Sequence, residues 1–192
     1  GIGDAKLKLI GVLNIGTDLK KSSITIYYQK DNGAINYAYY REIDLTGVST
    51  IGKASIGLNA CVATEDKPVS MDITGAKFYK ADVTDSFEFN SASYKQENGK
   101  TVVTAAYDYQ RTGNSKYTVI AAIYDNAGNE LTAAGIQTLT IDASDYLEGT
   151  KSVNIELDYS GDMTGKSVKL FTWNSIEGMK PMFDAKPVSA AE

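Results

Sequence analysis

Two tyrosines and three hydrogen-bonding side chains lie at alternating positions of two neighbouring segments, and together they have the chemistry to hold a sugar. The tyrosines are Tyr27 and Tyr40, and the polar residues are Gln29, Asn36 and Glu42. A tyrosine ring stacks on the apolar face of a sugar, and planar polar groups bond the sugar hydroxyls. This set therefore predicts a carbohydrate-binding platform. The alternative is that Tyr27 and Tyr40 form a cross-strand pair that covers a solvated sheet.

A β-hairpin would position these side chains. Residues 31–33 read Asp-Asn-Gly and separate two segments in which apolar and polar residues alternate. Asn-Gly favours a type I′ turn, because both central residues of that turn need positive φ. With the Asn-Gly pair as the loop, Tyr27 is expected to face Ala38 on the partner strand. By the same count Ile26 is expected to face Tyr39.

The opposite face of this hairpin is expected to be its core side, because isoleucines share it with tyrosines. It carries Ile24, Ile26, Tyr28, Ile35, Tyr37, Tyr39, Arg41, Ile43 and Leu45. Arg41 is the exception on this face, because a charged group among apolar side chains needs a partner or a position at the end of the sheet. Arg41 is therefore also a candidate clamp for a ligand.

Trp173, the single tryptophan, ends a segment that is apolar on both faces. Segment 166–173 places Phe171 and Trp173 on one face, which indicates a central strand or one at a module interface. We expect Trp173 to pack there, with Met179 and Pro181, as the lock of a sandwich in which this strand is the closing one. The alternative is an exposed ring that stacks on a sugar.

The composition excludes several kinds of chemistry. The 192 residues include no histidine and one cysteine, Cys61, in an apolar segment. Catalytic triads, Cys-His dyads and histidine-bound metals are therefore excluded, and the thiol is expected to be buried and inert. The net charge of −5 without a basic cluster argues against a nucleic-acid partner, and no apolar run is long enough for a membrane span. The carboxylates form no catalytic motif, so no enzyme is expected.

Calcium is the one metal that this composition permits, since calcium takes oxygen ligands. Segments 125–130 and 158–162 are acidic and turn-like, but neither has the spacing of a twelve-residue calcium loop. Hairpin chemistry alone explains the first segment, with Gly128 supplying a positive φ. No cofactor is expected.

Strand patterns cover most of the chain and predict an all-β fold. Turn residues at 82–85 divide it into two antiparallel β-sandwich modules, residues 1–82 and 83–192. The expected strands of the first module, apart from the partner strand of the hairpin, are 6–15, 23–30, 54–64 and 71–80. Those of the second are 86–94, 101–110, 116–125, 136–141, 153–159 and 166–173, with 130–134 as a further candidate.

Segments 122–129, 153–157 and 168–181 together resemble an immunoglobulin-like or fibronectin-III-like accessory module of large secreted and surface proteins of Gram-positive bacteria. Segments 55–60 and 71–79 are similar to the last two strands of jelly-roll carbohydrate-binding modules. These resemblances imply a non-catalytic region, located outside the cell or on its surface, beside other domains of a longer parent protein.

The leading hypothesis is therefore a non-catalytic carbohydrate-binding accessory region of a polysaccharide-active or surface protein, with a polysaccharide or glycan as its partner. The candidate site residues are Tyr27, Gln29, Asn36, Tyr40, Arg41, Glu42 and Trp173. The alternative is a structural spacer or adhesion module without a small ligand.

Overall fold

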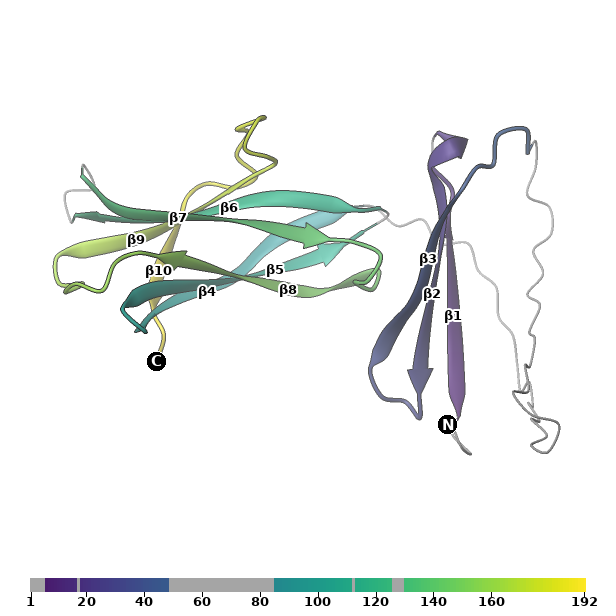
Figure 1. The fold of residues 1–192 in the computed structure, drawn as a ribbon, viewed down its shortest axis with the longest axis horizontal. Helices are drawn as coiled ribbons and strands as arrows, with labels where there is room; N and C mark the ends of the chain where they lie inside the picture. The colour runs from purple at the N-terminus through teal and green to yellow at the C-terminus, as the bar shows by residue number, and fades with distance from the viewer. Residues whose placement is uncertain (1–5, 17, 49–84, 112, 126–129) are drawn as a thin grey trace.

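The computed structural model describes residues 6–16, 18–48, 85–111, 113–125 and 130–192, and these residues form mainly β-strands (Figure 1). A three-stranded antiparallel sheet contains β1 (Leu7–Asn14), β2 (Ser22–Lys30) and β3 (Ile35–Ile43), with β2 in the middle. The one helix that the described residues contain, the 3₁₀ turn η1 (Leu19–Lys21), is far too short to cross a membrane. The predicted all-β fold class is confirmed.

Seven further strands form two packed layers. They are β4 (Ser86–Glu97), β5 (Lys100–Gln110), β6 (Ser115–Asp125), β7 (Leu131–Ile141), β8 (Glu148–Leu157), β9 (Lys166–Trp173) and β10 (Lys186–Ala190). One layer contains β8, β5 and β4, and the other contains β7, β6 and β9 (Figure 1). The short strand β10 joins the layers, since it pairs antiparallel with β9 and parallel with β4.

The core of this sandwich lies between the two layers. Alternate side chains of a strand point to opposite faces, so each strand contributes every second residue to the interior. The buried cluster consists of Val103, Ala105, Tyr107, Val119, Ala121, Ile123, Leu139, Val153, Ile155, Leu157, Val168, Leu170 and Val188. On β5, for example, the buried Val103, Ala105 and Tyr107 alternate with Thr104, Ala106 and Asp108, which point to the opposite face.

Aromatic rings fill one part of this core. Phe87 stacks on Tyr107 with ring centroids 4.8 Å apart, and on Tyr117 with centroids 3.7 Å apart. Tyr107 is fully buried, and its hydroxyl lies 2.7 Å from Thr172 Oγ1. Burial raises the pKa of Tyr107, and the hydrogen bond with Thr172 opposes that shift. The one polar atom of this large side chain is thus satisfied inside the sandwich.

The turn between β2 and β3 begins one residue earlier than predicted. Asp31 and Asn32 have positive φ values of 49° and 60°, and the amide of Gly33 donates to the carbonyl oxygen of Lys30 at 2.8 Å. Asp31 and Asn32 are therefore the two central residues, as in a type I′ turn, and Gly33 follows them.

A β-bulge at Ala38 compensates for the shifted turn. Tyr27 pairs with Tyr37 rather than with Ala38, so the predicted register is wrong near the turn. Beyond the bulge Ile26 pairs with Tyr39, as predicted. One extra residue in β3 restores the original alternation, because a bulge places two residues opposite one.

Most predicted strands are confirmed, and the largest difference is at the end of the chain. Residues 131–134 are the first part of β7 rather than a separate strand. The seventh strand is instead β10, which the sequence patterns missed because it is short and contains a proline. β9 is therefore an inner strand between β6 and β10, and the expectation that it closes the sandwich is wrong.

Part of the sequence interpretation lies outside the described residues. This applies to the predicted strands 54–64 and 71–80, to Cys61 and to Gly128. Within the described residues the first unit shows one three-stranded sheet. Its jelly-roll form and the division of the chain near residue 82 stay predictions.

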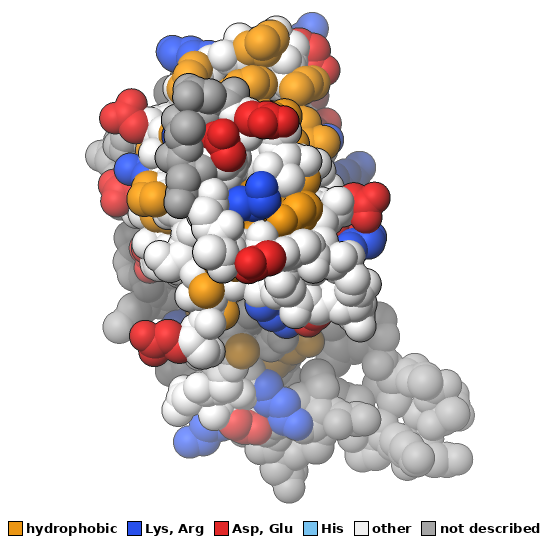
Figure 2. Space-filling view, turned by 90° about the vertical axis from the view of Figure 1, so that its left-hand side faces the viewer, with side chains coloured by type: hydrophobic (Ala, Val, Ile, Leu, Met, Phe, Trp, Pro, Cys, Tyr) orange, Lys and Arg blue, Asp and Glu red, His pale blue; other side chains and the backbone are white. Residues whose placement is uncertain are grey.

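Charges of both signs are intermixed at the end of the sandwich that lies away from the three-stranded sheet (Figure 2). Hydrophobic side chains gather toward the top of that view, which is the side of the β7, β6 and β9 layer in Figure 1.

Candidate functional site

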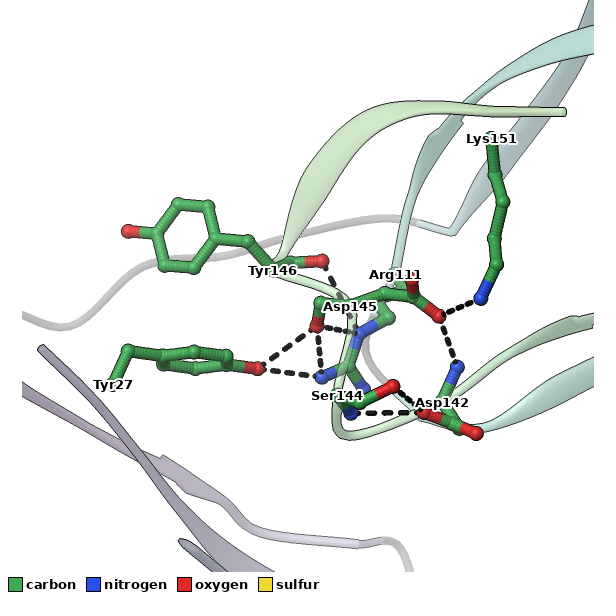
Figure 3. A network of polar contacts seen from close by, with 7 residues as sticks. All are labelled: Tyr27, Arg111, Asp142, Ser144, Asp145, Tyr146 and Lys151. Atoms are coloured by element: carbon green, nitrogen blue, oxygen red, sulfur yellow. Dashed lines mark hydrogen bonds and ion pairs between the residues drawn. The ribbon is translucent and has the colours of Figure 1, made fainter. Parts of the chain in front are cut away.

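The middle strand of the small sheet carries a tyrosine that is buried against the sandwich. Tyr27, in β2, is 1% exposed. Its hydroxyl donates to the carbonyl oxygen of Asp145 at 3.0 Å and accepts from Arg111 Nη2 at 2.7 Å (Figure 3). Its ring meets the ring of Tyr146 edge to face, with centroids 5.0 Å apart. We call the set Tyr27, Arg111, Asp145 and Tyr146 the joint, because it connects the two β units.

Arg111 follows the last residue of β5, and its guanidinium donates hydrogen bonds mainly to backbone carbonyl oxygens. Nε donates to the carbonyl oxygens of Asp145 at 3.1 Å and Tyr146 at 3.3 Å, and Nη2 donates to that of Asp145 at 2.9 Å. The residue is buried. Burial raises the pKa of the Tyr27 hydroxyl, and the neighbouring Arg111 charge opposes this. Tyr27 is therefore a neutral hydrogen-bonding group.

The turn between β7 and β8 is built to present the Asp145 carbonyl group. The Asp142 carboxylate accepts from the amide and the hydroxyl of Ser144 at 2.8 and 2.6 Å. These bonds hold the pKa of Asp142 below its usual value, the hydroxyl contributing most. The Asp145 carboxylate accepts from the Asp142 amide at 2.9 Å and from Lys151 Nζ at 2.6 Å (Figure 3). An ordered turn thus supports the joint.

A cleft of about 320 Å³ lies beside the joint, between the small sheet and the end of the sandwich. Its described lining residues are Val12, Asn14, Lys21, Ser23, Thr25, Tyr40, Glu42, Arg111, Gly113, Asn114 and Leu147. The Tyr40 hydroxyl lies 3.4 Å from Glu42 Oε1, at the long end of hydrogen bonding. One aromatic ring, a carboxylate, amides, hydroxyls and two cations thus surround a space near the lower limit of small-ligand pockets, roughly 300 Å³.

The structure brings together two of the predicted site residues, Tyr40 and Glu42, in this cleft. Tyr27 shares their face of the sheet, but it is buried in the joint. Gln29 and Asn36 lie closer to the turn. Gln29 Nε2 donates to the carbonyl oxygen of Gly33, and Asn36 Nδ2 to that of Ala34. Their amides therefore hold the hairpin rather than line the cleft.

Arg41 and Trp173 lie away from the cleft. Arg41 is exposed and pairs with Ile24, whose side chain belongs to the face opposite Tyr27. Trp173 is half-buried on the outer face of the other unit, and its backbone forms a bridge to Pro181. The expectation that Met179 packs together with Trp173 is wrong, because the Met179 side chain is 61% exposed.

The predicted inner and outer faces of the hairpin are not those observed. Tyr39, expected in the core, is 45% exposed, whereas Ser23 and Thr25 on the expected solvated face are buried. The bulge moves Tyr37 to the face of Tyr27, and the two rings meet edge to face at 6.4 Å. Burial on this sheet follows contact with the Arg111 and Asp145 region, which alternation within β2 does not reveal.

Sequence reasoning missed Lys21, Arg111 and Asn114. One sequence feature could have indicated Arg111, because this arginine comes directly after a strongly apolar strand and before a Thr-Gly-Asn turn. The run Asp142-Ala-Ser-Asp145 was another such feature, since aspartate two residues before a serine favours an ordered turn.

Oxygen atoms of the acidic loop at 158–162 accept hydrogen bonds from other groups of the chain. The Asp162 carboxylate accepts from the Thr164 amide at 2.9 Å, which holds the pKa of Asp162 below its usual value. The carbonyl of Gly161 accepts from Gln96 Nε2 at 2.8 Å. Segment 125–130 lies partly outside the described residues. In the described part of the chain no group of three or more acidic, histidine or cysteine residues is placed to hold a metal.

Comparison with known proteins finds partial likeness only. No family model and no curated protein match the chain. DesR, a beta-glucosidase from Streptomyces venezuelae in complex with D-glucose, is 14% identical with a TM-score of 0.33, over 54% of this chain and 15% of that one. A beta-glucuronidase from glycoside hydrolase family 2 is 15% identical with a TM-score of 0.34, over 53% and 11%. The chain spans a small part of either enzyme, and likeness at this level carries no functional conclusion.

Proposed function

We propose that this chain is a non-catalytic carbohydrate-binding region of a larger secreted or cell-surface protein, and that the cleft beside the joint is its sugar site. The observation that carries the proposal is the placement of Tyr40 and Glu42 in one cleft with Arg111 and Asn114. A ring, a carboxylate, a guanidinium edge and an amide offer stacking together with donors and acceptors for hydroxyl groups. Two loops and one sheet face enclose these groups, which suits one or two sugar rings.

The composition of the cleft supports binding rather than hydrolysis. Glycoside hydrolysis by the common mechanism uses two carboxyl groups roughly 5–10 Å apart across the bond that is cleaved. Glu42 is the single carboxylate among the described lining residues. The chain also has no histidine that could replace the second acid. A sugar in this cleft is therefore held without an acid and base pair.

The arrangement of the seven strands supports placing the larger unit among immunoglobulin-like accessory modules. It has layers of three and three strands, and β10 extends the second layer to four and pairs with β4 at its edge. Sandwiches of this kind carry many different functions, so the proposal depends on the cleft.

Calorimetric titration with a panel of plant and host oligosaccharides, both neutral and acidic, tests the sugar site. We expect at least one member to bind, and Tyr40→Ala to weaken it at least tenfold because stacking and the hydroxyl are both lost. The matched control is Tyr39→Ala, since Tyr39 neighbours Tyr40 but lies on the other face and is 45% exposed. Binding that survives Tyr40→Ala and Glu42→Gln together, or no binding across the panel, would count against the proposal.

A second candidate function is a rigid spacer, and the joint favours it. Tyr27 and Arg111 come from different β units, and both are buried by the contact. Such a contact limits the freedom of one unit relative to the other. Small-angle scattering distinguishes this role: a spacer without a ligand keeps one particle shape in the presence of every oligosaccharide, and Arg111→Ala broadens the range of shapes.

A further inference from the structure

The cleft beside the joint carries more positive than negative charge, although the chain as a whole is acidic. The chain has 24 acidic and 19 basic residues and a net charge of −5. Among the described residues that line the cleft, the basic ones are Lys21 and Arg111, and the single acidic one is Glu42. The proposed sugar site therefore reverses the sign of the charge that the rest of the chain carries.

The positive charge of Arg111 is buried without a carboxylate beside it. The residue is 7% exposed. Its hydrogen bonds with described residues go to the carbonyl oxygens of Asp145 and Tyr146 and to the hydroxyl of Tyr27, which are all neutral groups. None of the ion pairs between described residues includes Arg111. Because a buried charge costs free energy until an opposite charge neutralises it, this site favours a ligand that brings a negative charge.

The two carboxylates of the turn that supports the joint are bound to other groups. Figure 3 shows that the Asp145 carboxylate is directed to Lys151 Nζ, at 2.6 Å, whereas its carbonyl oxygen meets Arg111. The Asp142 carboxylate accepts from Ser144. The pKa of Asp142 is lowered most by the Ser144 hydroxyl and least by the Arg111 charge. The turn thus positions Arg111 through its carbonyl groups and leaves the guanidinium charge for a ligand.

The guanidinium of Arg111 also has a donor group that the joint does not use. Its hydrogen bonds with described residues involve Nε and Nη2, and none of them involves Nη1. A guanidinium offers five N–H donors in a planar fork that matches a carboxylate. Bonds of this kind are about twice as strong as those between neutral groups. Since Arg111 lines the cleft, a ligand carboxylate there can accept from Nη1.

The register of β2 and β3 places the stacking ring between this guanidinium and the acid of the cleft. Arg111 binds at the level of Tyr27. The next residue of β2 on the same face is Thr25, which pairs with Tyr40, and Glu42 follows Tyr40 by two residues on β3. Residues two apart on a strand are about 7 Å from one another. A sugar ring on Tyr40 therefore has Arg111 at one end and Glu42 at the other.

We propose that the sugar which this cleft binds is a uronic acid residue, with its ring on Tyr40 and its carboxylate on Arg111. This inference rests on the proposed function and adds the class of sugar to it. Glu42, at the other end, accepts from sugar hydroxyls and repels a carboxylate, so it sets the direction of the ring. Lys21 lies at the same end and offsets the charge of Glu42, so that the cleft as a whole attracts an anion.

A neutral sugar and a simple anion each fit this cleft less well than a uronic acid does. The hydroxyl groups of a neutral sugar accept from the guanidinium, but they leave its charge without an opposite charge. A simple anion supplies the charge but has no ring to lie on Tyr40. In a uronic acid the carboxylate is attached directly to the ring carbon, so one residue makes both contacts at once. The cleft therefore selects the combination of a ring and a carboxylate.

Calorimetric titration with matched pairs of sugars tests this inference. The probes are trimers of galacturonate, glucuronate and mannuronate, each beside its methyl ester, which has the same ring without the charge. We expect one acidic trimer to bind at least tenfold more tightly than its ester. Its affinity should fall as sodium chloride rises from about 50 mM to about 500 mM, whereas that of the ester should change little. Tyr40→Ala should weaken both members of the pair, because both stack on the ring.

A charge reversal at the open end of the cleft tests the electrostatic part without disturbing the joint. Lys21→Glu should lower the affinity for the acidic trimer at least fivefold and leave that of the ester nearly unchanged. Lys20→Glu is the matched control. Lys20 neighbours Lys21 in η1 and is exposed, but it is not among the described residues that line the cleft. Circular dichroism verifies the fold of each variant.

The outcomes separate this inference from the proposed function. A neutral oligosaccharide that binds as tightly as every acidic one, and that Tyr40→Ala weakens, overturns the inference and leaves the proposed function in place. Acid binding that neither salt nor Lys21→Glu weakens has the same meaning. If no sugar binds, or if Tyr40→Ala leaves all binding intact, the proposed function fails and the inference fails with it.

Discussion

The sandwich core and the joint each bury one tyrosine, and they do so by different means. Tyr107 is 0% exposed and Tyr27 is 1% exposed. Tyr107 lies among aromatic and aliphatic side chains of its own sandwich, with one hydroxyl contact to Thr172. Tyr27 lies between two β units, and its hydroxyl meets the Arg111 guanidinium and a backbone carbonyl. Equal burial therefore conceals a difference between apolar packing and polar docking.

This difference sets what each region contributes. Apolar packing is roughly proportional to the area removed from water, and it stabilises the unit that contains it. A buried guanidinium loses its hydration, and hydrogen bonds to its partners compensate for that loss only while the partners stay in place. The core should therefore dominate the free energy of unfolding. The joint should instead determine how the two units are held and how the neighbouring cleft is shaped.

The largest effect should come from Tyr107→Ala. Removing a large buried aromatic side chain leaves a cavity and typically costs about 3–5 kcal/mol. We expect a large fall in the urea midpoint, measured by circular dichroism, and loss of near-ultraviolet signal from the stacked rings. Tyr39→Ala is the matched control and should change the midpoint little, because Tyr39 is 45% exposed. A loss below about 1 kcal/mol would show that the aromatic cluster is not part of the core.

A smaller and more local effect should follow Arg111→Ala. Several hydrogen bonds to the carbonyl groups of Asp145 and Tyr146 and to the Tyr27 hydroxyl are lost, for which we expect a cost of about 2 kcal/mol. Hydrogen exchange should rise in β2 and in the β7 to β8 turn but not in β6 or β9.

The chain supplies its own control, because its only other arginine is Arg41. Arg41 is exposed on the opposite face of the small sheet, so Arg41→Ala should leave exchange in both regions unchanged. Uniform acceleration across the sandwich after Arg111→Ala would contradict a separate joint.

Tyr27→Phe should have a still smaller effect. The ring and its contact with Tyr146 stay, and only the hydroxyl bonds to Arg111 and Asp145 are removed. We expect a loss of about 1 kcal/mol in the free energy of unfolding. The wild type should also lose stability as pH rises above 10, the ordinary tyrosine value, because burial raises the folded pKa and the unfolded chain ionises first. For the Tyr27→Phe variant that alkaline loss should be smaller, and an unchanged alkaline profile would argue against the buried hydroxyl.

The smallest effect should be a pH dependence through Asp142. Its folded pKa lies below the ordinary 3.8, first because of the Ser144 hydroxyl, so the carboxylate stabilises the turn above about pH 4. That contribution is lost as pH falls through the folded pKa, and partial exposure keeps it below about 1 kcal/mol. Asp142→Asn should lower the urea midpoint slightly at about pH 7 and not at about pH 2. An equal difference at both values would assign the effect to packing rather than to charge.

The strands were predictable because each carries its own alternation or its own turn. Segment 166–173 matches β9 residue for residue, and 101–110 matches β5 except at its first residue. The failures have physical causes. β10 is too short for periodicity to be visible. The turn begins one residue early, so the register near it differs from the predicted one until the bulge at Ala38 restores it.

Of the candidate site, the sequence placed Tyr40 and Glu42 on one face, but it did not provide the other side of the cleft. Arg111 and Asn114 are about 70 residues further along the chain, and no local pattern connects them to β3. Nor could alternation decide that Tyr27 is buried and Tyr39 exposed, because alternation separates two faces without saying which one another unit covers.

The amino-acid sequence by itself determined the all-β class, the positions of most strands and turns, and the absence of histidine chemistry, because these depend on local spacing and composition. Only the tertiary structure decided which face of the hairpin is buried and that Tyr27 and Arg111 form a joint. Those features arise where distant segments pack together, and the free energy of such contacts is not encoded in any single segment.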